Sequence, residues 1–126
     1  MSGLFTDMKN HYTPQQLIVP STISANTNSA GADCDLGGAT DGGFAILEVG
    51  AVTALTSLDV QLKESDTSGG TYTAMQVPAS FPTVTVANKV HIINFHRSKK
   101  FVRAELTIVG TSAVCAVSIH NERKDP

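Results

Sequence analysis

The alternation of apolar and polar side chains near the end of the chain constrains its fold most strongly. From Val102 to Ile108 every second residue is apolar, and the segment from Ala113 to His120 repeats this period of two. Such a period is typical of a strand with one buried face, whereas a helix needs apolar residues three and four positions apart. Helical periodicity is almost absent from the 126 residues. We therefore expect an all-β chain.

Other segments add further strands to this pattern. Residues 44–52 are apolar on both parities, as expected where both faces of a strand are covered. Residues 58–63 alternate and are predicted to form a hairpin with residues 71–77. A turn is predicted at Gly110-Thr111-Ser112, between the last two strands. The shorter candidates are 17–19, which Pro20 should end, 34–36, 83–86 and 89–95.

These segments make about eight strands, many at the spacing of roughly 8–12 residues that is typical of a sandwich or barrel. No crossover helix separates them, which argues against a parallel sheet. Long connections within residues 20–43 suit Greek-key crossings, so we expect an antiparallel β-sandwich, jelly-roll-like, rather than a closed barrel. The length suits one domain, predicted to span residues 17–126 behind an irregular arm of residues 1–16.

The predicted arm is polar but carries apolar residues at irregular spacing. Such anchors suit a segment that becomes ordered on a partner, where filled pockets offset the lost chain entropy. The alternative is an arm folded back on its own domain. The four anchors are Leu4, Phe5, Met8 and Tyr12.

Charge and hydropathy exclude several classes of partner. The net charge is −2, and only residues 97–100 and Arg123-Lys124 form basic clusters, so we expect no direct nucleic-acid binding. No apolar run approaches the roughly 20 residues that span a bilayer, and the first ten residues lack the features of a signal peptide, so we expect no membrane partner. Folding in a cytoplasm leaves Cys34 and Cys115 as free thiols, although two cysteines are enough for one bridge.

No group of residues forms a recognisable catalytic or metal site. His91 and His96 are separated by an odd number of positions, which places them on opposite faces of a regular strand. Asp33, Asp35 and Asp41 lie among glycines, but their spacing does not match the EF-hand loop. We expect no enzyme activity, no cofactor and no metal. The absence of tryptophan weakens a carbohydrate-binding interpretation.

Arg103 and Glu105 share one face of the clearest strand. Two interpretations remain open for them. They form an ion pair on a solvated sheet face, or they belong to a contact between subunits.

Two segments carry a resemblance to a known group: SLDVQLKESDTSGGTYTAM, residues 57–75, and KKFVRAELTIVGTSAVCAVSIHNERKDP, residues 99–126. The first resembles a hairpin of small virion proteins of tailed bacteriophages, and the second resembles the ending of the same proteins. The matching positions of the second segment are Phe101, Val102, Arg103, Gly110, Thr111, Ser112, Arg123, Lys124 and Pro126.

The resemblance implies a jelly-roll-like protein that decorates or cements a capsid through contacts with the major capsid protein. Its location is then the virion, assembled in the host cytoplasm. A tail or neck component and a carbohydrate- or ligand-binding module are the alternatives. Exposed strand edges and the apolar segment 44–52 favour a homo-oligomer, a trimer before a dimer. The expected interface residues are Leu4, Phe5, Met8, Tyr12, Arg103, Glu105, Arg123 and Lys124.

Overall fold

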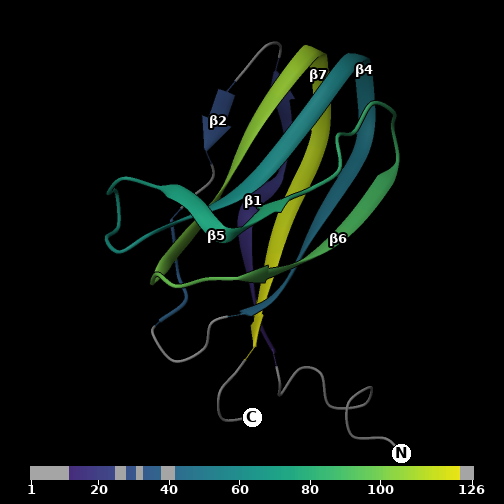
Figure 1. Ribbon diagram of the computed structural model, residues 1–126. Coiled ribbons are helices and arrows are strands. Elements are labelled where there is room, and N and C mark those ends of the chain that lie inside the picture. The colour runs from purple at the N-terminus through teal and green to yellow at the C-terminus, as the bar shows by residue number, and fades with distance from the viewer. Residues whose placement is uncertain (1–11, 25–27, 31–32, 38–41, 123–126) are drawn as a thin grey trace, which may run out of the picture.

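A computed structural model of the chain describes residues 12–24, 28–30, 33–37 and 42–122. These residues form strands and connecting segments without a helix, so the prediction of an all-β chain is confirmed (Figure 1). In this described part, no helix is long and apolar enough to cross a membrane. The strands are β1 (Tyr12–Ser24), β2 (Asn28–Ala30), β3 (Cys34–Asp35), β4 (Gly42–Ser65), β5 (Thr73–Ser80), β6 (Lys89–His96) and β7 (Phe101–Glu122).

The strands form one open antiparallel sheet built on two long strands. The order is β1-β7-β4-β5, and β6 also pairs with β4, while β2 and β3 pair with β7. Along β4, residues 42–49 pair with β6 and residues 61–64 pair with β5. The predicted hairpin of residues 58–63 and 71–77 is confirmed by the β4–β5 register. The arrangement agrees with the expected antiparallel, jelly-roll-like β-sandwich.

The long strands change the predicted number of strands from about eight to seven within the described residues. Residues 44–52 and 58–63 belong to one strand, β4, and the two closing segments belong to one strand, β7. The turn predicted at Gly110 is therefore wrong. Gly110 pairs with Leu55 and has a φ of +132°, the neighbouring Ala54 of β4 has a φ of +45°, and the β4–β7 register shifts between Leu55 and Ser57. The chain absorbs this irregularity as a bulge in a continuous ladder.

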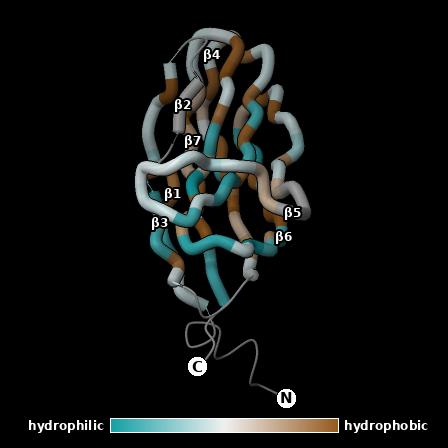
Figure 2. Tube along the Cα trace, turned by 60° about the vertical axis from the view of Figure 1, so that its left-hand side comes forward, coloured by the Kyte–Doolittle hydropathy of each residue, from teal (hydrophilic) through white to brown (hydrophobic). Residues whose placement is uncertain are grey.

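The bulged middle of the sheet explains how both halves share one core. In β7 the buried residues are even-numbered from Val102 to Ile108 and odd-numbered from Ala113 to Ile119. In β4 they are odd-numbered from Ala45 to Val49 and even-numbered from Leu58 to Leu62. One displaced residue moves every following side chain to the other face, so the parity change keeps both halves pointing inward. Figure 2 shows hydrophobic positions along the strands of both halves.

The first strand corrects the boundary of the predicted arm. Tyr12 to Gln16, which we expected in the irregular arm, pair with β7 at the start of β1. The strand also continues beyond Pro20, with a register shift between Ile18 and Ser21. Proline lacks a ladder donor, but β1 is an edge strand, where this loss is tolerated. Residues 1–11 lie outside the described part of the chain.

Two buried charged side chains hold the connection between β6 and β7. Glu64 accepts hydrogen bonds from the Ser98 backbone N–H at 2.8 Å and from its hydroxyl at 3.1 Å. Arg97, only 6% exposed, donates to the carbonyls of Gly37 at 2.7 Å, Leu36 at 2.9 Å and Lys99 at 3.0 Å, and to Asn121 Oδ1 at 3.3 Å. Arg97 therefore ties the segment before β4 to both ends of β7.

Candidate interaction site

The half of the sheet in which residues 57–65 of β4 pair with residues 101–109 of β7 presents a polar outer face. Val102, Ala104 and Leu106 point inward, so the odd-numbered residues of β7 between them point outward. Arg103 and Glu105 therefore share one face, as the alternation predicted. Lys63 of β4 pairs directly with Arg103 in the antiparallel register.

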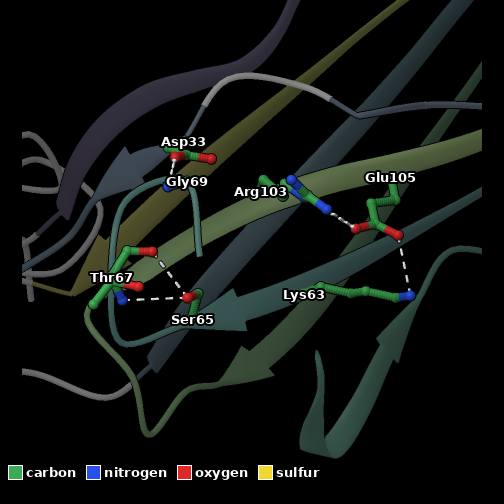
Figure 3. A network of polar contacts seen from close by, with 7 residues as sticks. All are labelled: Asp33, Lys63, Ser65, Thr67, Gly69, Arg103 and Glu105. Atoms are coloured by element: carbon green, nitrogen blue, oxygen red, sulfur yellow. Dashed lines mark hydrogen bonds and ion pairs between the residues drawn. The ribbon is translucent and has the colours of Figure 1, made fainter. Parts of the chain in front are cut away.

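Glu105 joins the two cations of this face into one cluster. Its Oε2 accepts hydrogen bonds from Arg103 at 2.9 Å and 2.6 Å, and its Oε1 lies 3.0 Å from Lys63 Nζ (Figure 3). Like charges opposite each other on neighbouring strands repel, and the carboxylate offsets this repulsion. Partial burial acts to raise the pKa of Glu105, but the hydrogen bonds from Arg103 and Lys63 outweigh it, so the pKa lies below its usual range.

The ring of Tyr72 packs against the Arg103 guanidinium of this cluster. The Arg103 guanidinium carbon lies 4.1 Å from the centroid of the Tyr72 ring, which is the geometry of a cation–π contact. Tyr72 is buried, and this burial, reinforced by the Asp33 carboxylate, raises the pKa of its hydroxyl to about 12. The ring thereby fixes the guanidinium on one side while Glu105 fixes it on the other.

Asp33 anchors the β4–β5 loop beside Tyr72. Its carboxylate accepts hydrogen bonds from the Ser68 hydroxyl at 2.9 Å and from the Gly69 N–H at 2.6 Å. The pKa of Asp33 lies below its usual value. The nearby Tyr72 hydroxyl is the largest cause and the Gly69 and Ser68 donors come next, although the Tyr72 hydroxyl has no hydrogen-bond partner of ordinary geometry. Within the loop, Ser65 Oγ both donates to the Thr67 carbonyl and accepts from the Thr67 N–H (Figure 3). The loop is therefore held in place next to the charged cluster.

A groove with a volume of about 550 Å³ lies over this face. Asp59, Gln61 and Lys63 of β4 line one side, and Arg103 and Glu105 contribute the cluster from β7. The charges of the groove are already engaged, since Asp59 accepts a hydrogen bond from Thr83 and Glu105 holds both cations. A preorganised, mixed-charge surface of this kind suits recognition of a polar partner surface.

Protonation of Glu105 tests whether the cluster stabilises the fold. Because the pKa of Glu105 is lowered on folding, its contribution is complete above the unfolded pKa near 4.3 and is lost as the pH falls through the folded value. We expect Glu105→Gln to lower the free energy of unfolding at neutral pH by less than about 1 kcal/mol. The difference from the wild type should shrink below about pH 4.5.

The control for this substitution is Glu48→Gln, which removes an exposed carboxylate of β4 away from the cluster. Denaturant unfolding at several pH values measures all three proteins. If Glu105→Gln and Glu48→Gln give the same pH profile, the cluster contributes no stability.

Tyr12, the one other predicted interface residue within the described ranges, does not join this site. Tyr12 lies at the start of β1 and packs edge-on against Phe44, with 5.1 Å between ring centroids. Phe44 also stacks on His120 at 4.6 Å, and burial lowers the pKa of this histidine. This aromatic group lies in the opposite half of the sheet from Arg103. Leu4, Phe5, Met8, Arg123 and Lys124 lie outside the described residues.

The residues considered for metal binding are separated or already engaged. The register places His91 opposite the buried Leu47 and His96 opposite Gly42, so the two rings lie on opposite faces, as their spacing predicted. Asp35 accepts a hydrogen bond from the Gly37 N–H at 2.8 Å, while Asp41 lies outside the described residues. In the described ranges, no three histidine, cysteine, aspartate or glutamate side chains are grouped as metal ligands would be.

Both cysteines are free and buried. Cys34 donates a hydrogen bond to Gln15 at 2.7 Å, and burial raises the pKa of its thiol to about 11. Burial also raises the pKa of Cys115.

Comparison with known proteins identifies a shared fold. The chain is similar to a chain in the structure of infectious bursal disease virus, Gx strain, with a TM-score of 0.56 and 10% identity. The match covers 89% of this chain and 31% of the viral chain, so this chain spans about a third of the length of its neighbour. At this identity the likeness shows the fold alone.

A second similar structure is the SPBc2 prophage-derived protein YomS, with a TM-score of 0.46 and 13% identity over 86% of this chain and 92% of that protein. This likeness is too weak to carry an argument. No protein-family model matches the chain, and no curated protein matches its sequence.

Proposed function

We propose that this chain is a virion structural protein of a tailed bacteriophage that decorates or cements the head. The observation that carries the proposal is the likeness of nearly the whole chain to part of a chain from a virus structure. The resemblance of residues 57–75 and 99–126 to phage virion proteins supports the same class. In this proposal the chain acts by contact, as a homo-oligomer on the major capsid protein, and has no catalytic role.

The polar outer face formed by residues 57–65 of β4 and residues 101–109 of β7 supplies a surface suited to such contact. Arg103 and Glu105 are held in fixed positions by Tyr72 and Lys63, so little side-chain entropy is lost when a partner binds. A mixed arrangement of charges also favours one orientation of the partner over others. We assign this face to the contact with the major capsid protein.

The groove favours one alternative function, a module that binds a carbohydrate or another polar ligand. Its volume of about 550 Å³ is within the range of small-molecule sites, and polar side chains converge on it. A tail or neck component is the other alternative. The position of the chain in the virion distinguishes these functions, because a decoration protein covers the outer head lattice, a tail component does not, and a ligand-binding module has no fixed place in the particle.

A further inference from the structure

The edges of the sheet differ in how they are protected from pairing with another chain. An edge strand exposes unpaired N–H and C=O groups, and proteins protect such edges with proline, bulges, charges or short strands. The β1 edge has Pro14, Pro20 and two register shifts. On the other side of the sheet, β5 has a register shift in its pairing with β4.

The edge strand β6 has none of these protections along its middle. Its eight residues pair with β4 in one unbroken register, and in the described part of the chain it has a strand partner on that side alone. It contains no proline, and its one full charge, Lys89, lies at its first residue. Val90 and Ile92 are 62% and 63% exposed, although both are large apolar side chains. An edge strand with an unbroken register and exposed apolar side chains is a template for strand pairing.

The outward residues of β6 lie in one row with those of β4. Ile92 pairs with Ile46, whereas Asn94 pairs with Phe44 and Val90 pairs with Glu48, so the one fully apolar pair lies at the centre of the row. This row is separate from the core, because the inward residues of β4 at the same level, Ala45 and Leu47, are completely buried. Residues 44–49 therefore place their odd-numbered apolar side chains in the core. Their even-numbered apolar side chains, Phe44 and Ile46, form part of this outer row.

We propose that β6 is the contact through which two copies of this chain associate, with the two β6 strands antiparallel about a twofold axis centred on Ile92. Residues directly opposite each other in an antiparallel pair point to the same face of the sheet, so even-numbered residues of one copy lie opposite even-numbered residues of the other. Ile92 therefore lies opposite Ile92 of the second copy, and Val90 lies opposite Asn94. Lys89 is then distant from Lys89 of the second copy, so no like charges face each other. The paired sheets form one continuous outer row in which Ile46 and Ile92 of each copy meet.

This inference rests on the proposed homo-oligomer and names its contact as a twofold one. It therefore selects the dimer over the trimer. Backbone hydrogen bonds supply the affinity, and the cross-strand apolar pairs contribute about 0.2–1 kcal/mol each.

Sedimentation equilibrium of the purified full chain across micromolar concentrations tests the contact. We expect the wild type to dimerise and Ile92→Lys to raise the dissociation constant at least about tenfold, because a lysine on an edge strand opposes pairing. Val86→Lys is the matched control, since Val86 is 51% exposed but lies outside the strands. Both variants should keep the wild-type melting temperature to within a few degrees, because both side chains are exposed.

A cysteine at the proposed axis tests the register independently of affinity. Ile92→Cys should form a disulfide-linked dimer under mild oxidation, whereas Val90→Cys should not, because its opposite residue is Asn94. The native thiols are buried and leave the new thiol as the accessible one.

A monomeric wild type, or equal dimerisation by the wild type and Ile92→Lys, overturns the inference. Equal cross-linking through positions 90 and 92 overturns the register. The failure of this inference can be distinguished from the failure of the proposed function. A monomer found on phage heads contradicts the β6 contact alone, whereas a dimer absent from virions contradicts the proposed function alone.

Discussion

Replacing Gly110 with alanine is expected to lower the free energy of unfolding by about 2–4 kcal/mol. A Cβ at this position would lie 2.4 Å from the Ala54 carbonyl oxygen and 2.8 Å from the Leu55 Cα, both backbone atoms of the neighbouring strand. The φ of +132° is also a conformation that residues with a side chain rarely adopt. The two long strands must therefore separate at their shared bulge, and the cross-strand contacts near it are lost.

Gly50→Ala is the matched control for this substitution. Gly50 is also a strand glycine, but a Cβ there would meet no atom closer than 3.8 Å and its φ is not positive. We expect it to change the free energy of unfolding by less than about 1 kcal/mol. Urea unfolding followed by far-ultraviolet circular dichroism measures both variants, since the chain has no tryptophan. Equal effects of the two substitutions would mean that the bulge tolerates a side chain.

Replacing the buried Arg97 with leucine is expected to lower the free energy of unfolding by about 3 kcal/mol. The guanidinium donates to the backbone carbonyls of Leu36, Gly37 and Lys99, which a leucine leaves without this donor. Arg97→Lys should recover only part of the loss, because an ammonium group does not reproduce the planar fork of donors. The same urea titration compares the two variants.

Lys100→Leu is the control for the loss of a positive charge near this position. Lys100 is half exposed and lies 3.6 Å from Asp35, a surface pair that contributes at most about 1 kcal/mol. If Arg97→Leu destabilises the protein no more than Lys100→Leu, then the buried arginine does not hold the β6–β7 connection in the way that its hydrogen bonds indicate.

Much of the fold was predictable from side-chain alternation. The inward set of β7, such as Val102 and Ile119, follows directly from it, and so does the β4–β5 hairpin. The continuity of the long strands was not predictable, because Gly-Thr-Ser is a frequent turn sequence and a glycine in a bulge has the same local signature. Only the pairing of Gly110 with Leu55 across the sheet distinguishes the two.

The candidate site was predictable only in part. Alternation placed Arg103 and Glu105 on one face, but the partnership with Lys63 depends on the register between β4 and β7, which sequence reasoning did not provide. Tyr72 and Asp33 were missed as supports of the cluster because they come from distant segments. Arg97 was grouped with residues 98–100 as a basic cluster, and its burial against the carbonyl groups of Leu36 and Gly37 was not predicted.

We propose that this chain is a structural component of the phage head. The most direct test of this claim is a cryo-electron microscopy comparison of virions that carry this chain with particles from a phage lacking its gene, before and after purified protein is added back. We predict that the difference density contains the seven-stranded fold on the outer surface of the head lattice and returns on add-back. Density confined to the tail or neck, or no difference between the particles, would contradict the claim.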